Sequence, residues 1–385
     1  MEEQKNQEQQ TTFEEEKQSA FIKCEGCGSN MTFDPLSQKL KCDYCGREED
    51  FAKDSSVKEL EIEQAFAQEA NWDEAVTYNC ENCGAKFLMQ ADEVAVTCPY
   101  CGTSHIVKTE NLTGIKPSAV YPFLLDKYGA VEHSKKWAKK RIFAPSAFKK
   151  NLIEENVRGV YYPCFTFDSD TNSVYEGRLG ERRTRTVRRN GKTHTETYIH
   201  WHYVKGRFNK FFDDVTITAG DMPQQHLDKL SPFKRETLCV YEKKFLSGYM
   251  ASHYSRDIKT CWSDAKKIID ARLQQDILHS YGYDVIDYLN VSTTHNDVTY
   301  KYVLLPTYHL HYRYNKKDYP VIINGNSGKV TGKAPVSPLR VIIAVILALA
   351  VLCGIGYGYL VSEGMASAHE IVNEICLNGK NLITK

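Results

Sequence analysis

The chain has 385 residues, of which 42% are hydrophobic and 25% charged, an ordinary composition for a protein of two to three domains. Eight of its 13 Cys form four Cys-x-x-Cys pairs before residue 102 and the rest are scattered, which argues against a disulfide framework. The formal net charge is zero, but residues 1–110 hold 10 Lys and Arg against 23 Asp and Glu. The rest of the chain is correspondingly basic, so the two parts are expected to have separate tasks.

Residues 1–20 contain six Glu, five Gln and two Lys, without an apolar run. This composition predicts a disordered acidic tail and no signal peptide.

Residues 21–52 and 77–108 repeat one cysteine pattern at an offset of 56 residues. In each unit 14 residues separate two Cys-x-x-Cys-Gly knuckles, so a short hairpin can gather four thiolates around one tetrahedral ion. The glycine after each pair supplies the backbone conformation that the knuckle needs. The sequence therefore predicts two zinc ribbons and two structural Zn²⁺ ions. The ligands are Cys24, Cys27, Cys42 and Cys45 in the first ribbon and Cys80, Cys83, Cys98 and Cys101 in the second.

Rival interpretations of the cysteine pairs are a redox role and iron in place of zinc. Each ribbon has more acidic than basic residues, and a four-thiolate zinc site adds about −2 to its charge. Such modules repel a phosphate backbone, so we expect a protein partner before a nucleic acid, with a purely structural role as the alternative. Residues 53–76 link the ribbons, and an apolar stripe predicts an acidic helix over 55–74.

Residues 115–335 mix strand and helix patterns and predict one α+β domain with a mainly antiparallel sheet. Two segments, 160–167 and 303–310, share three apolar residues followed by proline, which predicts strands with proline at a start or an edge and hints at a second duplication. Asn190-Gly191 predicts a hairpin turn between 184–189 and 192–198. An apolar face predicts a helix over 257–279.

The middle domain is basic, with one cluster at Lys135–Arg141 and another on the predicted hairpin. Such a surface could face anionic lipid, nucleic acid, the chain's own acidic part or simply solvent. His200 with His202, and His309 with His311, could each project from one strand face and together hold a metal. No nucleotide-binding loop or hydrolase motif is present, so we expect no enzyme activity.

Residues 341–361 carry no charge and, as a helix, would span roughly 32 Å, enough to cross a membrane. Basic residues precede the segment and acidic ones follow it, which predicts a single pass through the cell membrane with the N-terminal part in the cytoplasm. Residues 362–385 would form a short extracytoplasmic tail. Ala350, Gly354 and Gly358 share one helix face and would allow self-association.

The Cys-x-x-Cys-Gly ribbons resemble the ribbon of general transcription factor IIB. Together with the Pro-aromatic strands, the 322–332 segment Ile-Ile-Asn-Gly-Asn-Ser-Gly-Lys-Val-Thr-Gly and the C-terminal span, they look like bacterial TFIIB-type zinc-ribbon membrane proteins, some labelled after primosomal helicases. The resemblance covers residues 21–361. It implies a membrane subunit that recruits a flotillin-like (SPFH) protein and a phage-shock protein A homologue. Helicase activity does not carry over, because the nucleotide loop is missing.

These patterns together predict a non-enzymatic, membrane-anchored adaptor that recruits cytosolic protein partners. The first alternative is a membrane-tethered nucleic-acid-binding factor of TFIIB or replication type, acting through the basic hairpin. The second is a metalloenzyme on the histidines of the middle domain.

Overall fold

A computed structural model describes residues 22–67, 77–82, 84–88, 98, 100, 103, 106–109, 115–189, 191–314, 317–356 and 358. Its contacts divide the chain into two compact units. The larger unit comprises Met1–Trp137 with Leu152–Lys333, and the smaller comprises Ala138–Asn151 with Ala334–Lys385. The predicted tails 1–20 and 362–385 lie outside the described residues, and the predicted domain boundaries stay a prediction.

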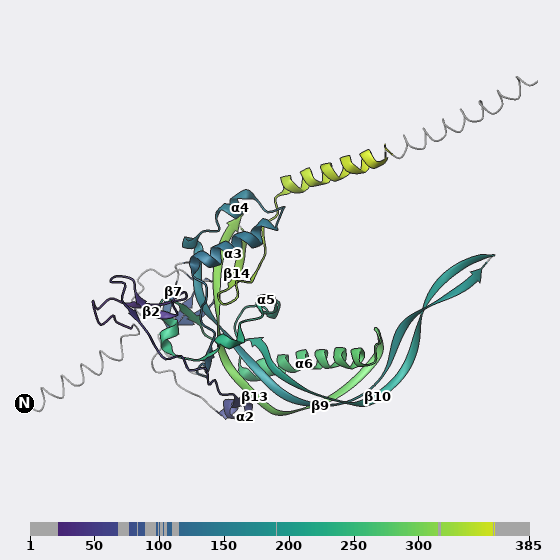
Figure 1. Ribbon diagram of the computed structural model, residues 1–385, viewed down its shortest axis with the longest axis horizontal. Coiled ribbons are helices and arrows are strands. Elements are labelled where there is room, and N and C mark those ends of the chain that lie inside the picture. The colour runs from purple at the N-terminus through teal and green to yellow at the C-terminus, as the bar shows by residue number, and fades with distance from the viewer. Residues whose placement is uncertain are drawn as a thin grey trace, which may run out of the picture. The chain divides into compact units, whose positions relative to one another are not determined.

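Three unusually long strands form the spine of the larger unit: β9 (Val157–Arg189), β10 (Lys192–Thr218) and β13 (Val285–Tyr314). β9 lies in the middle and pairs antiparallel with both of the others (Figure 1). Beyond Gly180, which pairs with Val285, the described part of β9 pairs with β10 alone. Residues 181–200 thus form a two-stranded arm, which turns at Gly191 with a φ of 75°. The Asn-Gly hairpin is confirmed, but its strands are far longer than predicted.

Pro163 and Pro306 lie inside β9 and β13, each with paired residues on both sides, so the prediction that they start or edge a strand is wrong. Each proline lies where its strand changes neighbours. β9 pairs with β12 (Met250–Ser252) before Pro163 and with β10 after it, while β13 pairs with β8 (Ala119–Val120) before Pro306 and with β14 (Lys317–Asn324) after it. At such a switch the missing N–H of proline costs no ladder hydrogen bond. The two carbonyls also accept equivalent bonds, from the N–H of Ala219 and of Gly325. This matched geometry agrees with the suggested second duplication.

The predicted helix over 257–279 is confirmed as α6 (Ile258–Ser280), which lies along the three long strands (Figure 1). Asp257 caps its first turn by accepting a hydrogen bond from the Thr260 N–H, and Gly282 follows its end with a φ of 69°. Its buried residues recur every three or four positions from Ile258 through Cys261, Ala265, Ile269 and Leu273 to Ile277, and the adjacent Leu278 is buried as well.

The remaining elements are short. The helical ones are α2 (Ile62–Ala67), α3 (Lys127–Lys139), α4 (Ser146–Lys150), η1 (Glu154–Asn156), α5 (Gln224–Leu230), η2 (Arg235–Thr237) and η3 (Lys243–Leu246). The strands are β1 (Met31–Asp34), β2 (Lys39–Cys42), β3 (Glu48–Glu49), β4 (Leu60–Glu61), β5 (Thr77–Cys80), β6 (Lys86–Leu88), β7 (Ile106–Thr109), β11 (Cys239–Val240) and β15 (Val330–Gly332). The chain is thus of mixed α and β type, and its sheets are mostly antiparallel, as predicted.

The acidic helix predicted over 55–74 is wrong for its first part. Residues 51–59 have no regular structure, β4 pairs with β13, and only Ile62–Ala67 is helical. Residues 68–76 lie outside the described residues. Tertiary contacts explain why residues 55–61 are not helical. Val57 packs on an apolar cluster of the sheet, and Glu59 pairs with Lys301. These contacts outweigh the weak local preference for helix.

Gly328 lies in the turn between β14 and β15 and contacts His133 of α3, and Gly191 is its matched control for a packing test. Both have a φ near 75°, but a Cβ on Gly328 would lie 2.3 Å from the ring of His133, whereas a Cβ on Gly191 would meet nothing within 4 Å. Left-handed backbone costs a non-glycine residue roughly 1–2 kcal/mol. We therefore expect Gly191→Ala to lower the free energy of unfolding by about 1 kcal/mol and Gly328→Ala by about 2 kcal/mol or more. Equal effects in denaturant unfolding of the purified chain would contradict the packing at Gly328.

Candidate functional site

The first four cysteines converge at one end of the three-stranded sheet β1-β2-β3. Their Sγ atoms all lie within 4.8 Å of one another, with Cys24 to Cys45 at 3.6 Å and Cys27 to Cys42 at 3.5 Å. Four sulfurs at about 2.3 Å from a tetrahedral zinc ion would be about 3.8 Å apart, close to these distances. The group could therefore hold a metal ion, and the donor set suits zinc.

The backbone of each knuckle supports this arrangement. The N–H of Cys24 donates to Ser29 O and that of Cys42 to Arg47 O, while Gly28 and Gly46 donate back to the same cysteines. Both glycines have a φ near 74°. Hydrogen bonds from the N–H groups of Cys45 and Tyr44 lower the pKa of Cys42 to about 7, so this sulfur is readily a thiolate. At Cys45 the Arg47 N–H also lowers the pKa, but the neighbouring thiols outweigh it and raise the pKa to about 12.

The second ribbon is described only in part, because Cys83 and Cys101 lie outside the described residues. Its two other cysteines repeat the knuckle bonds, from Cys80 N–H to Ala85 O and from Cys98 N–H to Thr103 O. Both are buried in one apolar cluster with Phe87, Val160 and Met250. Among the described residues, the complete group of four cysteines is therefore that of the first ribbon. The second zinc site stays a prediction.

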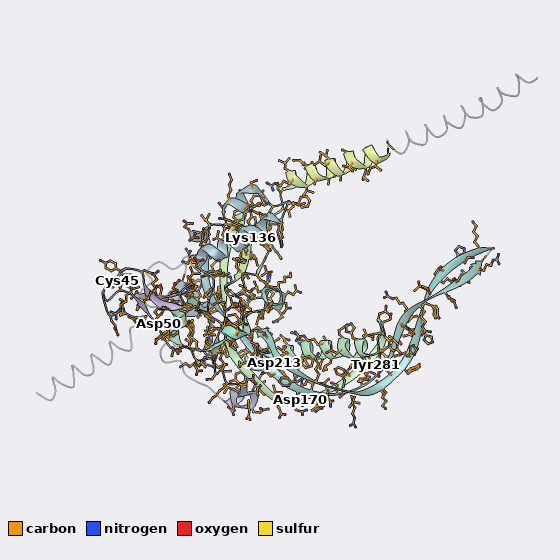
Figure 2. The ribbon with its side chains drawn as sticks, in the orientation of Figure 1. Cys45, Asp50, Lys136, Asp170, Asp213 and Tyr281 are labelled. Carbon is orange, nitrogen blue, oxygen red and sulfur yellow. The ribbon has the colours of Figure 1, made fainter. Side chains whose placement is uncertain are left out.

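Equivalent tyrosines of the two ribbons have different surroundings. In the first ribbon Tyr44 is 83% exposed (Figure 2 labels the adjacent Cys45). In the second, Tyr100 is half-buried, lies 5.0 Å from the ring of His309 and shares a hydrogen bond with Ser252. The second ribbon also joins the main sheet, because β6 pairs with β12. The first ribbon is attached to the same unit by the rings of Phe33, Phe51 and Phe245.

The predicted four-histidine site does not form. His200 pairs with Glu181 near the arm, whereas His309 pairs with Arg158 at the start of β9, so the two histidine pairs lie far apart along the sheet. His309 is buried and hydrogen-bonded to Thr307 at 3.0 Å. His200 and His202 do lie together, with the Nδ1 of one 2.8 Å from the Nε2 of the other.

A buried cluster of charged side chains, centred on Lys301, was not predicted from the sequence. Lys301 on β13 is 4% exposed, and its Nζ lies 2.8 Å from Glu59, 2.8 Å from Asp214 and 3.4 Å from Asp168. Burial raises the pKa of Asp168 to about 6. Burial opposes the charge on Lys301 too, but the carboxylates outweigh it and raise the pKa of the amine. A lysine among tyrosines on a strand was the available signal, but the bulge that places Asp214 cannot be seen in the sequence.

Asp213, labelled in Figure 2, completes this cluster. Arg235 binds it through two hydrogen bonds of 2.7 and 2.8 Å, which lower the pKa of its carboxyl, and contacts Asp214 at 2.9 Å. Three aspartates close together could hold a metal ion, but Lys301 and Arg235 already supply the positive charge. The cluster therefore serves to join the linker between the ribbons, through Glu59, to the sheet.

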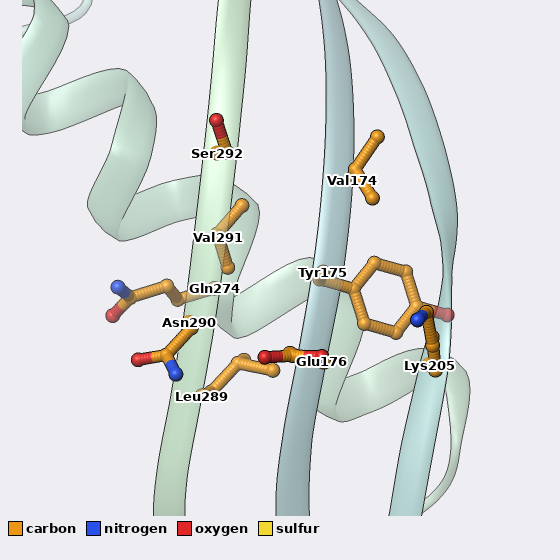
Figure 3. A pocket seen from close by; sticks show the side chains of 9 residues that line it. All are labelled: Val174, Tyr175, Glu176, Lys205, Gln274, Leu289, Asn290, Val291 and Ser292. Atoms are coloured by element: carbon orange, nitrogen blue, oxygen red, sulfur yellow. The ribbon is translucent and has the colours of Figure 1, made fainter.

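An open pocket of about 540 Å³ lies beside the middle of the long strands (Figure 3). Its lining combines Glu176 and Lys205 with apolar and amide side chains. The metal-ligating groups found among the described residues lie outside this pocket.

The smaller unit contains a helix, Pro338–Gly356, that is long and apolar enough to cross a membrane. Its side chains are exposed. Arg340 near its start donates hydrogen bonds to Ile142 O, Ala144 O and Ser146 Oγ at 3.1, 2.6 and 2.6 Å. Residues 138–151 are therefore held at the start of the helix, and they carry five basic residues: Lys139, Lys140, Arg141, Lys149 and Lys150.

Comparison with known proteins gives one informative match. No family model and no solved structure matches the chain. Over 319 residues the chain is 30% identical to the uncharacterized protein YdjG of Bacillus subtilis (strain 168), a match that spans 82% of this chain and 90% of that protein. The chain belongs to the YdjG family. Because the match covers most of both proteins, the similarity of this YdjG-family chain to its relative extends over more than one module.

The free energy of unfolding of this YdjG-family chain should depend on the Lys301 cluster. Lys301→Met leaves the buried carboxylate of Asp168 without its cation, which typically costs about 3–5 kcal/mol. Lys267→Met on α6 is the control, because its side chain is 74% exposed and its ion pair with Asp264 is worth little. We expect denaturant unfolding to show a large loss for Lys301→Met and a change below about 0.5 kcal/mol for Lys267→Met. Similar losses would show that the cluster does not support the fold.

Proposed function

We propose that the chain is a membrane-anchored adaptor that recruits a cytosolic protein through its first zinc ribbon. The observation that carries the proposal is the contrast between Tyr44 and Tyr100. These residues are equivalent in the repeat, yet the second is built into the sheet while the first is left on the surface. A large exposed aromatic side chain at the tip of a rigid knuckle suits a binding hot spot.

Charge supports a protein partner for this surface. Exposed acidic residues surround the knuckles of the first ribbon, namely Glu25, Asp43, Glu48 and Asp50. Arg47 and Lys39 pair with several of them, and four thiolates around one zinc ion add further negative charge. The surface therefore favours a partner with a basic face. An SPFH-type protein or a phage-shock protein A homologue is the partner that the resemblance of the ribbons implies.

The anchor of the adaptor is the helix Pro338–Gly356. The basic residues held beside its first turn by Arg340 favour the cytoplasmic side for this end. A cytoplasmic ribbon also suits zinc thiolates, which persist best where thiols stay reduced. The ribbons and the long sheet would then share the cytoplasm, and residues 362–385 would lie outside.

The exposed arm favours nucleic-acid binding as a second candidate function. It carries Arg182, Arg183, Arg185, Arg188 and Arg189 on a strand that is mostly open to solvent. Several of these are partly neutralised, by Glu181, Glu196 and Asp284, so the candidate ranks second. Binding of DNA that weakens steeply with added salt would support it, and no binding at low salt would remove it. A metalloenzyme is not favoured, because the four histidines do not meet.

Zinc content tests the ribbons. We expect Cys42→Ser to lose one zinc ion per chain relative to the unchanged protein, because it removes a buried ligand of the first site and leaves the second ribbon intact. Cys353→Ser, on the apolar helix, is the control and should keep the full content. Elemental analysis of the purified chain gives the answer. Unchanged zinc in Cys42→Ser would contradict metal binding at the first ribbon.

Tyr44→Ala tests recruitment. Loss of a hot-spot side chain costs about 2 kcal/mol or more, so we expect recovery of the partner from crosslinked native membranes to fall by roughly 30-fold. Tyr128→Ala on α3 is the matched control, since Tyr128 is also an exposed tyrosine, at 60%. Both variants should keep their zinc and their membrane insertion. Equal recovery of an SPFH-type or phage-shock protein A-like partner by both variants would overturn the assignment to Tyr44.

A further inference from the structure

We propose that Glu181, His200 and His202 form a binding site for one divalent transition-metal ion at the base of the arm. His200 lies directly across the ladder from Glu181, and His202 follows two residues later on the same face of β10. The strand geometry alone therefore brings two imidazoles and one carboxylate to one place. The site is separate from both ribbons and goes beyond the adaptor function.

The distances within the group suit a common ion. His200 Nδ1 lies 2.8 Å from His202 Nε2, and these nitrogens lie 3.8 and 3.6 Å from Glu181 Oε1. Ligands at about 2.0–2.1 Å from a tetrahedral ion are about 3.3–3.4 Å apart, which falls between the three distances. Small rotations of exposed side chains would make the three edges equal, without any movement of the backbone.

Neighbouring aromatic rings hold one ligand in place. The ring of His202 stacks on Tyr283 at 4.8 Å with an interplanar angle of 6°, and Tyr283 stacks in turn on Tyr281. The Tyr281 hydroxyl lies 2.7 Å from that of Tyr175, a residue of the buried cluster under the end of α6. Figure 2 labels Tyr281 at this point. Ligand orientation by such outer contacts is typical of metal sites.

Arg183 competes with an ion here, because it forms an ion pair with Glu181 through Oε1. A carboxylate has a second oxygen and about four lone-pair positions, so Glu181 can bind a metal ion and Arg183 together. Three other arginines of the arm are paired with acidic groups away from this site, Arg185 and Arg189 with Glu196 and Arg182 with Asp284.

The donor set selects the class of ion. Two imidazoles and a carboxylate suit Zn²⁺, Ni²⁺ or Cu²⁺ and are poor ligands for Ca²⁺ and Mg²⁺, which prefer oxygen. Three protein ligands leave one position open to water or to a donor from another molecule. Because Glu181 and His200 belong to different strands, the ion would also link β9 to β10 where the support of β13 ends.

The test is calorimetric titration of Zn²⁺ into the full-length chain in detergent, with the ribbons already loaded with zinc. We expect one further equivalent to bind to the unchanged chain. His200→Ala should weaken this binding by at least about tenfold, since even outer-sphere changes cost about 10–100-fold. Glu181→Gln should weaken it as well. His194→Ala is the matched control, because His194 is an exposed histidine on the same face of the arm, six residues away, and should bind as the unchanged chain does.

Two outcomes would overturn the proposal. If no further equivalent binds, the group is only a hydrogen-bonded surface cluster. If all the variants bind equally, the ion is held by histidines in general and not by this site. Cys42→Ser separates the site from the ribbons, because it should lose a ribbon ion and keep the titratable equivalent. Failure of partner recruitment by Tyr44→Ala would leave the titration unaffected.

Discussion

The pairing of β9 with β13 is the constraint on which the rest of the structure depends. These two strands run antiparallel from Leu310 opposite Val157 to Val285 opposite Gly180, with two irregularities in register. Several described elements of the larger unit are attached to this pair, namely the hairpin strand β10, helix α6, the second ribbon through β12 and the linker through β4. Two mid-strand prolines allow both strands to exchange neighbours without leaving an unpaired donor.

The two copies of the cysteine repeat are attached to the larger unit in different ways. Both copies keep the knuckle hydrogen bonds of the cysteines. What differs is their attachment, since the second contributes strands to the main sheet while the first is attached by three phenylalanine rings. Glu59 fixes the intervening segment on Lys301. An adaptor of this kind would present its docking surface from a fixed position on the sheet and not from a flexible tether.

Local chemistry was predictable from the sequence and long-range pairing was not. The four cysteines of the first ribbon, the Asn-Gly turn and α6 each depend on residues within a few positions, so their patterns predicted them. The length of β9 was missed because its outer half has polar side chains on one face and reads as separate short segments. The Lys301 cluster joins residues more than 200 positions apart, at Glu59 and Lys301, through a bulge that no periodicity reveals. The helix over 55–74 failed for the same reason, because tertiary contacts overrode local preference.

The arm has a consequence for solubility. A two-stranded ribbon has two open edges, and open edges readily pair with those of another chain, the route to aggregation. Along the described arm β9 is rich in arginine, and it carries one acidic residue, Glu181, while Glu196 lies opposite on β10. Like charges would meet if two arms were brought edge to edge, so self-pairing is disfavoured. The chain can therefore extend a long two-stranded ribbon into solvent without edge-to-edge pairing between copies.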